Sequence, residues 1–271
     1  MRFLKILIDL NIWVAAGATA LFHYTLNLFQ LPSNLWLILF VFFSTLFTYQ
    51  GQNYLKERLR QKSGNQKIKR FQLLSLLFSS SSIIVIVLFF PVIDKTVIIL
   101  FSSFLLSLFY AFPFKSSSNK PKMNLRSRPF LKIYLIALVW TAVCAFFPLY
   151  RNGSIDTSNW LWIISVFILI LAITIPFDIR DLKFDKENMR TIPQIMGVKR
   201  AKHLALFLIA LSFSAFFLAS QLTYISNLNF ILFSILCGLN ALFIWKCHPE
   251  KDPYYFGSLI DGSLLILFLS V

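Results

Sequence analysis

The chain has 271 residues, of which 58% are hydrophobic and only 14% charged, and its formal net charge is +15. Soluble domains carry about 25% charged residues, so this composition excludes an ordinary soluble domain and indicates an integral membrane protein. The basic residues lie between apolar runs and form no separate basic domain, so we expect no nucleic-acid partner.

Nine apolar runs are long enough to cross a bilayer, which takes about 20 residues each. The first run has no small-residue cleavage site and is followed by further runs, so it predicts a retained helix rather than a removable signal. We expect a single all-α integral membrane domain over residues 1–271. Its spans are predicted at approximately 3–29, 34–51, 71–91, 95–114, 129–150, 158–177, 202–223, 226–246 and 254–271.

The basic residues predict the orientation of these spans. With a cytoplasmic N-terminus, 24 of the 26 Lys and Arg residues lie on the inner side, and only Lys95 and Arg151 lie outside. Lys and Arg bias short loops toward the cytoplasm, so the pattern favours a cytoplasmic N-terminus and an outer C-terminus. The inner loops are also the longer and more polar ones, and we therefore expect the active face to be cytoplasmic.

An acidic stretch follows the sixth span, where Asp178, Asp181 and Asp185 are spaced three and four residues apart. On a helix these spacings place the carboxylates on one face, where like charges repel by roughly a few tenths of a kcal/mol per pair. The stretch is either a cation site or a solvated acidic loop end. Together with nearby cations it suits a metal–diphosphate ligand, because Mg²⁺ typically takes one or two carboxylates plus substrate phosphates.

Two further carboxylates lie inside apolar runs, Asp9 in the first and Asp261 in the last. A carboxylate at the middle of a membrane helix costs roughly 2.5–3.5 kcal/mol on insertion scales, and it often marks a site. For Asp9 we favour a side chain that reaches the membrane interface, with Asn11 able to share a hydrogen bond. For Asp261 two alternatives stay open, a functional site and a side chain that reaches the membrane interface.

Two inner loops carry candidate binding residues. After the second span, Tyr49 to Gln61 predict a polar helix that extends out of the membrane. At the end of the fourth span, the stretch from Tyr110 to Lys115 leads into a basic loop. That loop either closes over an anionic ligand, which Lys and Arg bind well, or serves only to set the topology.

These residues resemble a known family. Asp178-Ile-Arg-Asp181-Leu-Lys-Phe-Asp185, followed by Arg190-Thr191-Ile-Pro193 and Gly197, is similar to the second aspartate-rich motif of the UbiA superfamily of intramembrane prenyltransferases. The Phe112–Lys115 stretch resembles the loop in which that family holds diphosphate with a lysine near a tyrosine. The resemblance implies a nine-helix bundle around a cavity open to the cytoplasmic face and to lipid. It also implies transfer of an isoprenyl group from a polyprenyl diphosphate to a lipid-soluble, usually aromatic, acceptor.

The resemblance implies Mg²⁺ as the cofactor, and it assigns roles to individual residues. The catalytic metal ligands would be Asp178, Asp181 and Asp185, with Glu57 as a further metal ligand, and the substrate-binding residues would be Lys115, Arg190, Asn53 and Tyr110.

The family's first motif, N-D-x-x-D-x-x-x-D, is degraded in this chain. Asn53 and Glu57 align with its Asn and its second Asp, whereas Tyr54 and Gln61 replace the other two carboxylates. Two hypotheses therefore stand, a membrane prenyltransferase and a catalytically silent relative that binds a lipid or a protein partner. A small-solute transporter is disfavoured, because no inverted repeat or matched pair of broken helices is visible.

Overall fold

The computed structural model of this chain describes residues 2–60, 66–89, 96–111, 131–153, 155–183 and 191–270. Within these ranges every regular element is helical, which confirms the predicted all-α class. The elements are α1 (Arg2–Asp9), α2 (Ile12–Leu28), α3 (Leu35–Arg60), α4 (Gln66–Phe89), α5 (Val97–Ala111), α6 (Leu131–Thr141), η2 (Ala142–Phe146), α7 (Phe147–Asn152), α8 (Thr157–Asp181), α9 (Ile192–Leu222), α10 (Asn227–Lys246), α11 (Pro253–Tyr255), η4 (Phe256–Asp261) and η5 (Leu264–Leu269). Elements η2 and η4 are π-helices, and η5 is a 3₁₀-helix.

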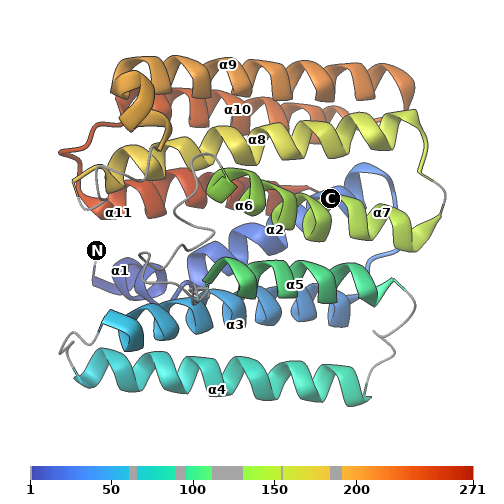
Figure 1. The fold of residues 1–271 in the computed structure, drawn as a ribbon. Coiled ribbons are helices and arrows are strands. Elements are labelled where there is room, and N and C mark those ends of the chain that lie inside the picture. The colour runs from blue at the N-terminus through green and yellow to red at the C-terminus, as the bar shows by residue number, and fades with distance from the viewer. Residues whose placement is uncertain are drawn as a thin grey trace, which may run out of the picture.

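The long helices form one bundle (Figure 1). Helices α9 and α10 lie on one side of it, α4 lies on the opposite side, and α2, α6 and α8 lie between them. Helix α8 packs against α9 and α6, and α3 packs against α2 and α4. Helices α1 and α11, the end of α8 and the start of α9 lie at the same end of the bundle, so segments far apart in the sequence meet there.

Five of the described helical stretches are long and apolar enough to cross a membrane. They are Leu35–Tyr54, Leu131–Asn152, Thr157–Asp181, Ile192–Leu222 and Asn227–Lys246, and three shorter apolar helices cover Leu73–Leu88, Ile98–Ser107 and Pro253–Leu269. These helices support a multi-pass membrane protein. The count of nine spans and the cytoplasmic side of the N-terminus stay predictions.

The first and last predicted spans are not single regular helices. The run predicted at 3–29 is divided into α1 and α2 at Asn11, whose φ of 56° is left-handed. Asparagine is one of the few residues other than glycine that adopts this conformation readily. The run predicted at 254–271 consists of α11, η4 and η5 in succession.

Helix α9 begins at Ile192, well before the predicted start at 202. The start is set locally, since the backbone N–H of Thr191 donates to Gln194 Oε1 at 3.0 Å and Pro193 occupies the first turn. Proline is favoured there because its missing N–H would be unpaired in any case. Gly197 then kinks the helix with a φ of 80°, a left-handed conformation that suits glycine.

An aromatic core holds α8 in place. Tyr24 and Trp162 lie with ring centroids 5.6 Å apart, and Phe216 and Phe233 with centroids 4.3 Å apart. The Tyr24 hydroxyl donates to the carbonyl oxygen of Asn229 at 2.6 Å. These residues come from α2, α8, α9 and α10, so the four helices are fixed to one another by buried rings that each contribute large apolar areas.

Asp156 caps the start of α8. Its carboxylate accepts from the backbone N–H of Asn159 at 2.8 Å and from the Ser158 hydroxyl at 2.7 Å. These hydrogen bonds stabilise the charged form and lower the pKa of the carboxyl.

We therefore expect Asp156→Ala to lower stability by about 1 kcal/mol at neutral pH, as loss of an N-cap does. Because the folded-state pKa is lowered, the stabilisation is present above the ordinary carboxyl pKa of about 3.9 and is lost as the pH falls through the folded value. Thermal unfolding in lipid nanodiscs at neutral and acidic pH measures both effects. Asp156→Asn, which keeps the cap, is the matched control, and equal losses in the two variants would exclude capping as the cause.

Candidate functional site: a polar end on an apolar cavity

A cavity of about 880 Å³ opens inside the bundle. Its walls are mainly apolar and come from α1, α2, α3, α4, α5, α6, η2, α8, α11 and η4. The charged and amide side chains that line it are Asp9, Asn11, Gln52, Asn53, Lys132, Arg180, Asp181 and Asp261. An apolar hollow with a few polar groups is the usual form of a site for a small amphipathic molecule.

The last turn of α8 carries an aspartate pair that is tied to α6. Lys132 Nζ donates to Asp178 Oδ1 at 2.5 Å and lies 4.0 Å from Asp181 Oδ2. The Asp178 side chain is only 4% exposed and that of Lys132 is 16% exposed. The Asp178 carboxylate therefore requires the Lys132 cation, since an unpaired charge that is buried away from water is costly.

Arg180 completes this group of charges. Its Nε donates to Asp181 Oδ1 at 2.7 Å, and its guanidinium lies 5.1 Å from the centre of the Phe177 ring. Asp181, Arg180 and Lys132 line the cavity, whereas Asp178, the partner of Lys132, is not among the lining residues. The cavity therefore has two cations and one carboxylate on the wall formed by α6 and α8.

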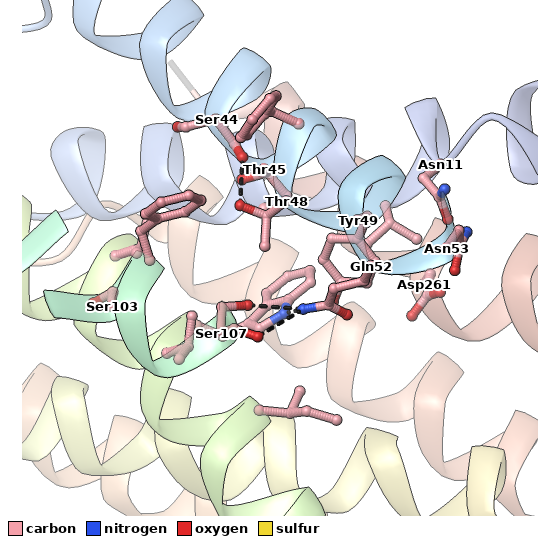
Figure 2. A pocket seen from close by; sticks show the side chains of 18 of the residues that line it. Asn11, Ser44, Thr45, Thr48, Tyr49, Gln52, Asn53, Ser103, Ser107 and Asp261 are labelled. Atoms are coloured by element: carbon pink, nitrogen blue, oxygen red, sulfur yellow. Dashed lines mark hydrogen bonds between the residues drawn. The ribbon is translucent and has the colours of Figure 1, made fainter. Parts of the chain in front are cut away.

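A second set of polar groups comes from α3 and from the break between α1 and α2. Figure 2 shows Asn11, Asn53 and Asp261 grouped at one end of the pocket. Gln52 lies beside Asn53 in α3, and its Nε2 donates to the Ser107 hydroxyl of α5 at 2.9 Å.

The structure brings together some of the predicted site residues. Asp178 and Asp181 share the last turn of α8, and Asn53 lines the same cavity as Asp181. Helix α8 ends at Asp181, so it carries only two of the three carboxylates that we expected on one helical face.

The remaining predicted residues are not placed. Glu57 lies in α3 and Tyr110 in α5, and neither side chain is among those described. Lys115, Asp185 and Arg190 lie outside the described residues.

Lys132 and Arg180 were missed as site residues. Both are basic residues at the inner end of a predicted span, which topology alone explains. Arg180 carried a weak signal, since it stands between two candidate ligands in the acidic stretch. Lys132 carried none, because its partner Asp178 is 46 residues away in the sequence.

The described donor set suits Mg²⁺ only when a ligand shares the ion. Within the described ranges no three His, Cys, Asp or Glu side chains lie close enough to hold a metal by themselves. An ion held by protein groups alone therefore does not fit these residues. Asp181 at the cavity wall, with the amides of Asn53 and Gln52 in the same cavity, does fit an ion that keeps several waters and shares a phosphate-bearing ligand.

The fold is similar to that of several solved structures. The chain is similar in structure to a UbiA homologue from Archaeoglobus fulgidus bound to GPP and Mg²⁺, with a TM-score of 0.63, 11% identity, and coverage of 97% of this chain and 99% of that one. The same homologue bound to DMAPP and Mg²⁺ gives a TM-score of 0.62, 12% identity, and coverage of 98% and 99%. A digeranylgeranylglyceryl phosphate synthase gives 0.57, 18% identity, and coverage of 99% and 98%.

At these identities the structural similarities establish the fold alone. A search of curated proteins finds no match. The model of the UbiA prenyltransferase family matches residues 63–256, which is well over half of the chain. This chain therefore belongs to the UbiA prenyltransferase family.

Proposed function

We propose that this protein is an intramembrane prenyltransferase that moves an isoprenyl group from a prenyl diphosphate to a lipid-soluble acceptor such as an aromatic ring. One observation carries the proposal: a cavity of about 880 Å³ with apolar walls has Lys132, Arg180 and Asp181 on one wall. A prenyl diphosphate has the same division, with a hydrocarbon tail and a strongly charged head. The similar A. fulgidus homologue has been solved with two such ligands, GPP and DMAPP.

The described residues suit the departure of diphosphate. When the bond between the allylic carbon and oxygen breaks, the electron pair leaves with the diphosphate, and the prenyl carbon becomes an electrophile. Lys132 and Arg180 lie on the cavity wall, where they stabilise the charge that grows on the leaving group. Mg²⁺, when bound with Asp181 and diphosphate oxygens, would neutralise further charge there.

The rest of the cavity protects the electrophile. Tyr49, Phe47 and Phe104 line its wall, and aromatic faces attract cations. Apolar walls also exclude water, which would otherwise capture the prenyl group before the acceptor does. The acceptor then forms the new bond to the prenyl carbon and loses a proton.

The active face is proposed to be cytoplasmic. The end of α8, the start of α9 and the ends of α1 and α11 lie together at one end of the bundle (Figure 1). Among the described residues, Lys5, Arg180, Lys183, Lys199 and Lys251 lie in or beside these helix ends, and basic residues gather on the cytoplasmic side of membrane proteins.

A silent relative is the second candidate, and a specific observation favours it. Both described aspartates of the second motif already have cationic partners, Asp178 with Lys132 and Asp181 with Arg180. Together with the degraded first motif, this arrangement suits binding of a diphosphate lipid without turnover. This candidate predicts retained cellular function in an Asp178/Asp181 double variant.

One experiment separates the two candidates. The purified chain in nanodiscs is supplied with radiolabelled prenyl diphosphates of several lengths and a lipid extract that contains acceptors, with Mg²⁺ or with EDTA. The transferase predicts Mg²⁺-dependent release of diphosphate and transfer of label to the lipid fraction. Saturable binding of the diphosphate with neither product would reject the transferase in favour of the silent relative.

A further inference from the structure

Asp261 is a carboxylate for which the two aspartate-rich motifs give no role. It ends the π-helix η4, in an apolar stretch that runs from Pro253 to Leu269, and its side chain lines the cavity. No described residue makes a hydrogen bond or an ion pair with its carboxylate, although Arg180 lies near enough to act on it electrostatically. A charge kept in a membrane bundle is expensive, and it usually serves a ligand.

Close packing fixes Asp261 where it is. A Cβ on Gly17 of α2 would lie 3.3 Å from the Asp261 carbonyl oxygen, and a Cβ on Gly262 would lie 2.5 Å from Trp13 Nε1. The two glycines therefore allow η4 to approach α2 more closely than larger residues permit. The π-helical turn also changes the direction of the side chain relative to a regular helix, a feature common at functional sites.

This packing predicts a measurable effect for Gly262→Ala. The added methyl group meets the indole of Trp13, so we expect a loss of stability of about 1–3 kcal/mol, typical of overpacking. Gly238, whose Cβ would meet nothing within 4 Å, is the matched control in α10. Thermal unfolding in nanodiscs measures both, and a Gly262→Ala variant as stable as Gly238→Ala would show that the contact does not constrain the helix.

Two amides lie with Asp261 at one end of the pocket (Figure 2). Asn53 comes from α3. Asn53 and Glu57 are the two residues of this chain that match the first aspartate-rich motif. Asn11 comes from the break between α1 and α2, and its Nδ2 is buried with no partner in the described structure. Gln50, one turn before Asn53, donates to the Leu10 carbonyl oxygen, which joins α3 to this break.

The other charged groups of the cavity have partners. Asp9 accepts from the Tyr254 hydroxyl at 3.1 and 3.2 Å. In the second aspartate-rich motif, Asp178 pairs with Lys132 and Asp181 pairs with Arg180. Among the described acidic residues that line the cavity, Asp261 is the one without a hydrogen-bonding or ion-pair partner.

We propose that Asp261 and Asn53 bind a divalent cation together, with the Asn11 amide donating to a phosphate oxygen of the same ligand. Asp261 of η4 thus supplies a carboxylate that the first motif lacks, since Tyr54 stands where that motif has an aspartate. Mg²⁺ is satisfied by one carboxylate, one amide oxygen, phosphate oxygens and water, and an unpaired buried N–H costs about 1–3 kcal/mol unless a ligand accepts from it. The inference rests on the proposed function, because it places the metal–diphosphate head in this cavity.

The test measures metal binding without turnover. Mn²⁺, visible by electron paramagnetic resonance, is titrated into the full chain in nanodiscs, with and without geranyl S-thiolodiphosphate, an analogue that does not react. We expect the analogue to strengthen Mn²⁺ binding in the wild type. Asp261→Asn should weaken that binding by about tenfold or more. Loss of a residue that only hydrogen-bonds to a metal ligand already costs about 10–100-fold in affinity, and loss of a ligand should cost at least as much. Asp252→Asn, in the same segment but at an exposed helix cap, should bind as the wild type.

A carboxylate exchange makes the test decisive. In the Asn53→Asp/Asp261→Asn variant the charge moves across the pocket, and binding should return to within a few fold of the wild type if both side chains hold one ion. No recovery, or wild-type binding in Asp261→Asn alone, overturns the inference. If the Asp261 inference fails but Asp181→Ala still weakens Mn²⁺ binding, the proposed function stands without a role for Asp261. If the wild type shows no binding that depends on the analogue, the proposed function fails as well.

Discussion

Prenyl transfer should fall by at least about 100-fold when Asp181 is replaced by alanine, which is the scale of losing one preorganised group that stabilises charge at a reacting centre. Asp181 lines the cavity between two cations, with Arg180 Nε at 2.7 Å from one oxygen and Lys132 Nζ at 4.0 Å from the other. Its loss removes a proposed metal ligand and breaks the ion pair that holds Arg180, whereas Lys132 keeps its contact with Asp178. The initial rate of label transfer in nanodiscs measures the effect.

Two variants control for less specific causes. Asp181→Asn keeps an acceptor for Arg180 and removes only the charge, so a similar loss in this variant assigns the effect to the carboxylate. Glu250→Ala removes an exposed acid that pairs with Lys183 outside the cavity, and we expect it to retain full activity. Unchanged transfer in Asp181→Ala would exclude this aspartate from the mechanism.

The helical bundle could be predicted because its signals are local. Every predicted run contains a described helix, since each apolar run is long and is bounded by polar or proline-containing turns. The position of Asp178 and Asp181 on one helical turn could be predicted for the same reason, because a spacing of three residues is visible in the sequence. Their role as metal ligands stays a prediction.

The partners of these aspartates could not be predicted. The distance of 2.5 Å between Lys132 Nζ and Asp178 Oδ1 depends on how α6 is rotated against α8, which packing decides and local sequence does not. The same holds for Asp261, which enters the cavity because a π-helix and two glycines set its position against α2. The helix break at Asn11 could not be predicted either, since an asparagine inside an apolar run can equally remain helical.

Lys132→Met should destabilise the protein strongly. The variant keeps a similar side-chain length but leaves the Asp178 carboxylate, 4% exposed, without its closest cation. Removing one partner of a buried ion pair costs about 3–5 kcal/mol, and we expect the lower part of that range because Lys132 also borders the cavity. The thermal unfolding temperature in nanodiscs measures the loss.

The double variant Lys132→Met/Asp178→Leu determines whether the pair or the lysine alone is responsible. Replacing both members of a buried ion pair by apolar residues is often neutral for stability, so the double variant should recover most of the loss. Equal instability in the single and double variants would contradict an uncompensated Asp178 charge as the cause. Prenyl transfer should stay low in both variants, because recovery of stability does not return the cation that Lys132 presents to the cavity. The pair would then have two separable roles, one in the fold and one in binding the diphosphate.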